Sequence, residues 1–528
     1  MDSNQPAHGH VDDDAAQLAA LGYTSDFKRE MGLWGNVAVG FTYLSPIVGV
    51  YTLFSAAIAT AGPPMVWAFL IVGCGQFLVA LVFGEIVSQY PVAGGIYPWA
   101  RRLWGRRWAW MTGWIYMFAL FSSIGGIACG ASPFVASMLG HNYSVRYMVV
   151  AALALLALST IVNLGGTKVL SMAVTMGFIT GLIGAVGVGA WLLVRGSHDF
   201  SVIFKTMGAA DGKVYFFAFA SAGLVAVFQY YGFEACGDLA EEVPNPGVQI
   251  PKAMRMTIYI GGFAATFTAF TLIMAVVPNI TAVINSGGAC IDFDERTGEC
   301  ATGALDPVSH TIHEAFGSAD KIVLLIVVLA FLSCLISLQA AASRLLFSFS
   351  RDKMIMGHRF LRVFWQSRHV PPVALLVAGG VPAAIAIGSM LSESALWRII
   401  GFAAIGIYLG FQSVVLAALR ARLKGWQPSG KFRLGKWGLA VNIGALTWGV
   451  LGILAIVWPW DLGEPGFKWY DVWLVMLTAC VVIGSGLFYL FTAHPYRHSD
   501  TPSGDAIPVK GGTPTQDAIE DDPPDLTV

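Results

Sequence analysis

The sequence predicts an all-α integral membrane protein with twelve transmembrane helices. The chain has 528 residues, of which 56% are hydrophobic and only 12% are charged, whereas soluble proteins carry about 25% charged residues. The apolar residues form runs of about 20 residues, the length that a helix needs to cross a bilayer. Helices are expected because lipid leaves backbone amides unsatisfied, and the alternating pattern of a membrane barrel is absent. A soluble enzyme is therefore excluded.

The predicted spans follow one another along most of the chain. They occupy residues 34–60, 65–88, 109–138, 147–164, 169–194, 215–240, 254–277, 321–344, 373–391, 397–418, 437–458 and 470–492.

Two polar ends flank the predicted membrane domain, residues 30–492. Residues 1–29 are polar and lack the basic start and short apolar core of a signal peptide, so we expect a retained N-terminal tail. Residues 493–528 are rich in Pro, Gly, Thr and acidic residues, which predicts a disordered tail.

The basic residues predict the orientation. Most Lys and Arg residues fall in loops on the same side as the N-terminus, above all in the loops around 101–107 and 351–368. Because cytoplasmic loops carry the excess of positive charge, both ends are expected in the cytoplasm, in a plasma (inner) membrane. The net charge is −1 and no dense basic tract is present, so nucleic acid is not an expected partner.

The longest outer loop contains Cys290 and Cys300, ten positions apart. A disulfide is expected there, on the oxidising side of the membrane. A metal site is the alternative, but two thiolates without a nearby His make a poor zinc set, so we expect no metal. The other five Cys residues lie within apolar spans and are expected to pack as small hydrophobic residues.

The first span has an interruption near its midpoint, at Pro46 and Gly49. Proline removes an amide and clashes with the preceding turn, so backbone groups around 45–49 are expected to leave the helical ladder. The alternative is a proline kink that neighbouring helices repair.

The sixth span has a matching interruption, with Gly232, several aromatic residues and Glu234 at bilayer depth. A carboxylate there costs at least about 2.5 kcal/mol unless it is paired, protonated or facing a polar cavity, so we expect a functional role for Glu234. Glu85 and Asp238 lie nearer the inner ends of their spans. A structural salt bridge or snorkelling toward water is the expected explanation for both.

Spans 1 and 6 hold equivalent positions if the first ten helices form two halves, residues 30–195 and 214–420, followed by two helices in 437–492. Paired interruptions are typical of inverted-repeat transporters. The amino end of a half-helix favours a carboxylate, and freed carbonyls with an acid accept an ammonium group. A zwitterion fits both ends. An enzyme would need a catalytic constellation, which we do not find.

Three stretches resemble the amino acid-polyamine-organocation (APC) superfamily of permeases. GEIVSQYPVAGGIYPWA at 84–100 is similar to the signature that follows the family's second helix. The second match comprises GFE at 232–234, AEEVPNP at 240–246 and IPKA at 250–253, and the third is ASRLLFSFSRD at 342–352. The resemblance implies a leucine-transporter-like fold, with a five-plus-five inverted repeat and two appended helices. It also implies alternating-access transport of small organic nitrogen compounds, with a preference for the branch of 4-aminobutyrate and choline permeases.

The resemblance also implies a substrate site at the two interruptions. The substrate carboxylate would lie at Ser45, Pro46, Ile47, Val48 and Gly49. The amine would face backbone carbonyls near Gln229 and Tyr230, beside Gly232 and Glu234, with Tyr231 and Phe233 as lid or wall. Tyr116 and Tyr408 are further candidates for the cavity, although Tyr in spans more often packs or lies at the membrane interface.

Energy coupling is expected to use a proton. The fifth span contains no Lys or Arg, and Lys168 only borders it, whereas some relatives place a Lys there in place of a sodium ion. Burial favours the neutral form of a carboxyl, so Glu234 can bind and release a proton as the cavity opens and closes. Ser333 and Ser337 are candidates for a sodium site, or they cap backbone groups. We therefore expect proton symport of an amino acid or related amine, without a cofactor. Sodium symport, exchange and a non-transporting sensor are the alternatives.

Overall fold

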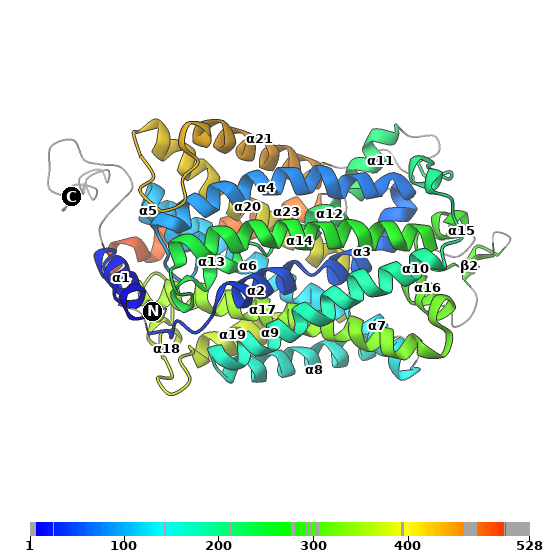
Figure 1. Cartoon of the computed structure of the whole chain (residues 1–528), viewed down its shortest axis with the longest axis horizontal. Coiled ribbons are helices and arrows are strands. Elements are labelled where there is room, and N and C mark those ends of the chain that lie inside the picture. Colours follow the sequence, from blue (N-terminus) through cyan, green and yellow to red (C-terminus); the bar gives the residue numbers. More distant parts are fainter. Residues whose placement is uncertain are drawn as a thin grey trace, which may run out of the picture.

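Long helices lie side by side along one axis of the molecule (Figure 1). The computed structural model describes residues 7–24, 26–141, 144–210, 214–275, 280–291, 293–294, 297–300, 306–391, 395–458, 473–500 and 502. Helix α1 lies at one end of the bundle, and the strands β1 and β2 lie at the other (Figure 1). We call these the α1 end and the hairpin end.

The described part of the chain up to Val194 contains five helical segments of spanning length, several of them made of consecutive helices. Its elements are α1 (Ala7–Ala20), α2 (Leu33–Leu44), α3 (Pro46–Ala61), η1 (Pro63–Met65), α4 (Val66–Gln89), α5 (Ile96–Trp104), α6 (Arg106–Gly130), α7 (Ser132–Leu139), α8 (Val145–Leu164), α9 (Thr167–Leu182), the π-helical turn η2 (Ile183–Val188) and α10 (Gly189–Val194).

The next part contains the second interrupted span and the hairpin. Its elements are η3 (Phe200–Phe204), α11 (Tyr215–Ala222), α12 (Leu224–Gln229), α13 (Ala235–Asp238), η4 (Ala240–Glu242), α14 (Pro246–Ala275), α15 (Ile280–Asn285), β1 (Phe293–Asp294), β2 (Glu299–Cys300), α16 (Pro307–Phe316), η5 (Gly317–Ala319), α17 (Asp320–Arg351), α18 (His358–Leu361), α19 (Pro372–Gly388), η6 (Ser389–Leu391) and α20 (Ala395–Leu423).

The last elements follow a short loop. They are η7 (Gly435–Trp437), α21 (Gly438–Val457), α23 (Leu474–Ala493) and η8 (Pro495–Arg497).

In the part of the chain that the structure describes, ten helical segments are long and apolar enough to cross a membrane. Two further apolar helices are shorter, Tyr215–Gln229 and Pro372–Gly388, so ten rather than twelve segments reach spanning length. The predicted run at 215–240 falls short because its helix stops at the interruption after Gln229. The predicted run at 373–391 falls short because regular α-helix ends at Gly388.

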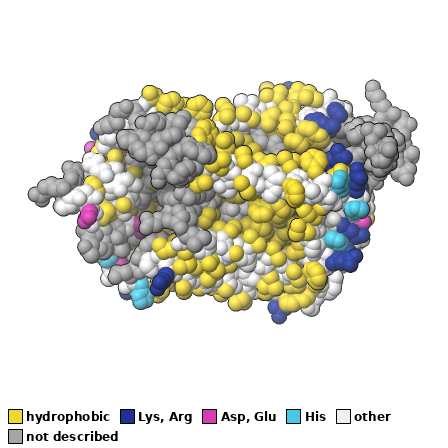
Figure 2. Space-filling view, turned by 180° about the vertical axis from the view of Figure 1, so that it is seen from behind, with side chains coloured by type: hydrophobic (Ala, Val, Ile, Leu, Met, Phe, Trp, Pro, Cys, Tyr) yellow, Lys and Arg dark blue, Asp and Glu magenta, His cyan; other side chains and the backbone are white. Residues whose placement is uncertain are grey.

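The first interrupted span lies at the centre of the bundle. In its most apolar stretch, Leu33–Ala61 is 94% buried within the protein, whereas Gly435–Val457 and Leu474–Ala493 are only 22% buried. The late helices therefore form part of the apolar outer surface, and Figure 2 shows hydrophobic side chains along the flank with Lys, Arg and His gathered at the α1 end. A backbone interruption at the centre is shielded from lipid, as such interruptions must be.

Segments near both ends of the chain contact the bundle. The N-terminal segment forms α1, where the side-chain nitrogen of Gln17 donates to the Gln89 carbonyl (3.4 Å). The predicted disordered tail begins too early, because residues 494–500 follow α23 in a defined path and the Ser499 hydroxyl donates to the Asp352 carbonyl (3.1 Å). Residues 503–528 lie outside the described part.

A disulfide joins Cys290 and Cys300 at the hairpin end. It closes the antiparallel pair β1 and β2, in which Phe293 faces Cys300. The bond ties this loop back on itself beside α15.

Candidate functional site

The first span is divided into α2 and α3 at Ser45. Ser45 has φ 36° and ψ 96°, outside the favoured regions for a residue with a side chain, and such outliers cluster at functional sites. Its hydroxyl accepts a hydrogen bond from the Val48 amide (3.4 Å) and caps the new helix. Pro46 is the first residue of α3, where a missing amide costs nothing. The amino end of a four-turn helix therefore begins in the middle of the bundle.

The second interruption lies against the first. Residues 230–234 are non-helical between α12 and α13, and Gly232 has φ 114°. A Cβ at Gly232 would lie 2.6 Å from the Leu44 amide nitrogen, and a Cβ at Gly49 would overlap the Gln229 side-chain oxygen. Glycine is required at position 232, where the two backbones approach too closely for a side chain, and Gly49 leaves room for the Gln229 side chain.

The Gln229 side chain connects the two interruptions. In an unbroken helix the Leu44 carbonyl would accept from the Val48 amide, but that amide is used by Ser45. The Gln229 side-chain nitrogen takes its place, donating to the Leu44 carbonyl (2.7 Å) and the Ser45 carbonyl (3.2 Å). Two carbonyls near the first interruption are thus satisfied within the protein.

Glu234 is fully buried directly after the second interruption. One carboxylate oxygen accepts from the Tyr116 hydroxyl on α6 (3.0 Å), and the other accepts from the Gly232 amide (2.7 Å). The Tyr43 hydroxyl lies beside the same carboxyl group. Among the described residues, no Lys, Arg or His forms an ion pair with Glu234. Its surroundings are phenols and backbone, which suit a carboxyl that gains and loses a proton.

Aromatic side chains surround the carboxylate on the α2 and α6 sides. The Tyr43 and Tyr231 rings are edge-to-face with centroids 5.8 Å apart, and the Tyr231 hydroxyl donates to the Ser123 hydroxyl (3.5 Å). The Tyr43 hydroxyl is buried and has no hydrogen-bond partner by strict geometry. Tyr43 and Ser123 were not predicted as site residues. Tyr43 lies two residues before the first interruption, and this position is the only sequence signal for its place in the site. The sequence offers no such signal for Ser123.

Other predicted site residues point away from this group. The Tyr230 hydroxyl donates to the Gly262 carbonyl on α14 (3.2 Å), so only its backbone belongs to the interruption. Phe233 packs between Phe83 and Phe411 (centroids 6.0 and 5.5 Å), which places its ring in the packed core rather than over the site as a lid.

Tyr408 belongs to a different buried group. Its ring lies against Gly452 on α21, and its hydroxyl lies close to Gln76 and Trp448. The structure therefore places Tyr408 between α4, α20 and α21, on the far side of α20 from the expected cavity. A single sequence cannot reveal which side of a buried helix faces a cavity when all sides are apolar.

The remaining candidate residues near the first interruption are Ile47, Ser333 and Ser337, and their side chains make packing contacts or hydrogen bonds within the helix bundle. Ile47 reaches the π-helical turn at Gly184. The Ser337 hydroxyl on α17 is hydrogen-bonded to the Thr42 hydroxyl (2.7 Å), and the Ser333 hydroxyl donates to the Ala330 carbonyl (3.0 Å). In the part of the chain described, no group of three or more His, Cys, Asp or Glu residues has the arrangement of a metal site.

Asp238 contradicts its expected role. Its side chain is fully buried, and neither carboxylate oxygen has a hydrogen-bond partner, so it neither forms a salt bridge nor reaches water. It lies one turn beyond Glu234 and against Gly95, at the amino end of α5, where the helix dipole favours negative charge. Glu85, in contrast, pairs with Arg422 and accepts from the Leu434 amide (2.8 Å), as expected.

The bundle is closed at the α1 end by buried ion pairs. Glu242 pairs with Arg344 (2.8 Å) and Glu241 pairs with Arg351 (3.0 Å). Asp352 accepts hydrogen bonds from the Tyr97 hydroxyl on α5 (2.8 Å) and from Tyr23 (3.2 Å). The second and third family-like stretches, 240–253 and 342–352, therefore meet at the α1 end of the bundle.

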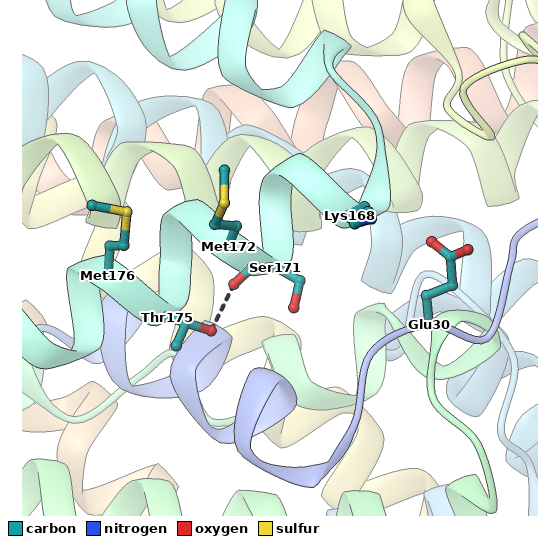
Figure 3. Close-up of a pocket in the computed structure, with 6 residues that line it drawn as sticks. All are labelled: Glu30, Lys168, Ser171, Met172, Thr175 and Met176. Atoms are coloured by element: carbon teal, nitrogen blue, oxygen red, sulfur yellow. Dashed lines mark hydrogen bonds between the residues drawn. The ribbon is translucent and has the colours of Figure 1, made fainter.

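Lys168 lines a separate pocket on the outside of α9. This pocket of about 480 Å³ is lined by Glu30, Lys168, Ser171, Met172, Thr175 and Met176. Figure 3 shows Glu30 approaching from the segment before α2, while the other residues lie along the start of α9. Met172 and Met176 are each 61% exposed, so the pocket opens outward and Lys168 is not part of the central site.

Comparisons with known proteins agree on one family. The family described as "Amino acid permease" matches residues 32–496. The "Amino-acid permease BAT1 homolog" of rice (Oryza sativa subsp. japonica) is 25% identical over 470 residues, 84% of this chain and 87% of its own length. "Amino-acid permease BAT1" of Arabidopsis thaliana is 23% identical over 483 residues, 85% and 90% respectively. A "Putative amino acid/polyamine transporter" of Macrophomina phaseolina is 24% identical over 455 residues, 80% and 93% respectively.

Proposed function

The chain belongs to the amino acid permease family of the APC superfamily, and we propose that it imports an amino acid or a related amine such as 4-aminobutyrate by proton symport with alternating access. The observation that carries the proposal is the contact between two interrupted helices beside a fully buried carboxylate, Glu234. An inverted-repeat transporter places substrate and coupling-ion sites at such a point.

The proposed architecture is a leucine-transporter-like fold with ten helices in two halves and two appended helices. In this scheme α2 with α3 is the first span, and α11 with α12 and α13 is the sixth. The ten segments of spanning length and the two shorter apolar helices supply the twelve crossings. The interrupted helices then occupy equivalent positions in the two halves.

The proposed substrate pose follows from the ends of the half-helices. The amino end of α3, at Ser45 to Gly49, presents the positive end of its helix dipole to the substrate carboxylate. The amine faces the second interruption, where Glu234 and backbone carbonyls near Tyr230 accept its hydrogen bonds. Tyr43 and Tyr231 form the aromatic wall beside it.

The proposed coupling ion is a proton carried by Glu234. A buried carboxylate without a basic partner is costly, so a proton or an ammonium group is needed to stabilise it. A sodium ion would compete for the Ser337 and Ser333 hydroxyls, which are bonded to Thr42 and to the Ala330 carbonyl. Sodium symport and exchange remain the alternative mechanisms.

The proposed orientation places the α1 end in the cytoplasm, in a plasma membrane. The support is the excess of Lys and Arg at that end (Figure 2). The ion pairs Glu241–Arg351 and Glu242–Arg344 then lie on the cytoplasmic path, and the structure corresponds to a state closed on that side.

Uptake into proteoliposomes tests the proposal. Labelled amino acids and 4-aminobutyrate are supplied with and without an imposed inward pH gradient. We expect the gradient to accelerate uptake of at least one substrate, and we expect Glu234→Gln to remove that acceleration. Glu314→Gln is a matched control, since Glu314 is exposed at the hairpin end. Uptake indifferent to both the gradient and Glu234→Gln would exclude the proton role, and binding without any movement across the bilayer would favour a sensor.

A further inference from the structure

A second pocket at the α1 end is lined entirely by basic and histidine side chains. It has a volume of about 530 Å³ and is lined by Lys353, His358, Arg359, Arg362 and His498. We call it the Lys353 pocket. One acidic group is close by, Asp500, which pairs with Lys353 (2.6 Å). Among the described residues, three permanent positive charges thus line a pocket in which one ion pair, Lys353 with Asp500, is formed.

Two segments far apart in the sequence build this pocket. One is the α17–α19 connection, fixed where the Trp110 indole donates to the Met354 carbonyl (2.7 Å). The other is the segment after α23, where the Asp500 amide donates to the Asp352 carbonyl (3.2 Å). Because both walls are held by these bonds, the positive charges are brought together by the fold and do not merely follow one another in a loop.

The same connection exposes large apolar side chains next to the positive charges. Met356 is 62% exposed, Phe360 is 72% exposed and Trp365 is 44% exposed. Arg359 and Arg362 alternate with these residues, and both are exposed. Aromatic and basic residues mixed at the end of a transmembrane helix are typical of a segment at the level of lipid headgroups.

We propose that the Lys353 pocket binds the phosphate headgroup of an anionic phospholipid, while Met356 and Phe360 contact the adjoining acyl region. Arg359 and Arg362 supply planar guanidinium groups that bind phosphate oxygens in pairs, and Lys353 supplies a point charge. A cluster of Lys and Arg just beyond the cytoplasmic end of a transmembrane helix is a recurrent form of anionic lipid site. The site is separate from Glu234 and does not depend on which substrate is carried.

Histidine protonation gives the site a pH dependence. Burial and then the charges of Arg359, Arg362 and Lys353 lower the pKa of His358 below its usual value, and Asp500 opposes this shift. A phosphate group in the pocket would offset the repulsion and favour the protonated form. Lipid binding then takes up a proton, so affinity increases as the pH falls through the histidine range. His498 lines the same pocket.

Thermal unfolding of the full-length protein in nanodiscs tests the site. The nanodiscs contain phosphatidylcholine alone or with increasing fractions of phosphatidylglycerol. We expect the anionic lipid to raise the unfolding temperature of the wild type, and more at pH 6 than at pH 8. We expect Arg359→Gln with Arg362→Gln to lose at least half of this increase.

A matched double variant separates the pocket from general surface charge. Arg433→Gln with Lys436→Gln removes the same charge from exposed positions in the α20–α21 loop and should keep the wild-type increase. The proposal would be overturned if both double variants lost the same share of the lipid-induced increase in unfolding temperature. An equal increase from inorganic phosphate in neutral nanodiscs would also overturn it, by assigning the pocket to a free anion.

Discussion

The side-chain nitrogen of Gln229 lies 2.7 Å from the carbonyl oxygen of Leu44. This hydrogen bond crosses between the two interrupted helices and replaces a helical bond that the Ser45 turn has removed. The half-helices are therefore held in register by a polar side chain as well as by packing. Any movement that separates the two interruptions must break or exchange this hydrogen bond.

Replacing Gln229 with Leu should reduce both stability and uptake. The Leu44 carbonyl would lose its donor in a water-poor interior, and the Ser45 carbonyl would keep only the Gly49 amide (3.4 Å), at a cost of about 1–3 kcal/mol. We expect a lower unfolding temperature in detergent and a lower maximal rate in proteoliposomes. Gln366→Leu is the control, because Gln366 is exposed. An unchanged unfolding temperature for Gln229→Leu would show that water replaces the side chain.

Replacing Gly232 with Ala should prevent the second interruption from packing against Leu44 at the first. The new Cβ would meet the Leu44 amide nitrogen at 2.6 Å, and φ 114° is unfavourable for any residue with a Cβ. We expect loss of substrate-induced thermal stabilisation together with loss of uptake. Gly380→Ala on α19 meets nothing within 4 Å and should behave as wild type. Full uptake by Gly232→Ala would contradict the observed contact.

Replacing Asp238 with Asn should stabilise the fold, since an unpartnered buried acid costs about 1–3 kcal/mol. Stabilisation of this kind often accompanies lost function, so we expect slower proton-driven uptake with a higher unfolding temperature. Glu85→Gln is the matched comparison and should act in the opposite direction. It leaves the partly buried Arg422 without its ion-pair partner, which should lower the unfolding temperature. A lower unfolding temperature for Asp238→Asn would mean that its charge is compensated by the α5 dipole.

Replacing Asp352 with Asn should loosen the α1 end. Asp352 accepts hydrogen bonds from Tyr97 and Tyr23, and hydrogen bonds to charged groups contribute about 1.5–3 kcal/mol. The buried thiol of Cys236 on α13 reports the opening. We expect faster alkylation of Cys236 by a small maleimide in Asp352→Asn than in Asp13→Asn, which alters an exposed acid. Equal alkylation rates would show that other contacts keep this end closed.

The class of the protein and the interruptions were predictable because both depend on local chemistry. Long apolar runs require helices in lipid, and Pro46 with Gly49 predicts a broken first span wherever it packs. The helix lengths were less predictable. The sixth apolar run extends to residue 240 with an interruption inside it, but the sequence did not show that its regular helix stops at Gln229, where residues 230–234 pack against Leu44.

The sequence singled out residues of the candidate site, whose roles stay predictions, and it did not give their contacts. Glu234 is buried beside the interruptions, as its cost in lipid suggested, and Tyr116 reaches it. Phe233 and Tyr408 point elsewhere because apolar helices give no sequence signal for which side faces a cavity. Asp238 was expected near water from its place in the sequence, but α5 covers it.

The sequence by itself determined a multi-pass membrane protein of this family, with two helices that cannot continue and one carboxylate too costly to be incidental. The tertiary structure alone decided which groups meet there. Gln229 and Leu44 are 185 residues apart, and Tyr116 and Glu234 are 118 apart. Propensity and hydropathy act over a few turns of helix, whereas a hydrogen bond requires two groups within about 3 Å, and only the packing of whole helices sets that distance.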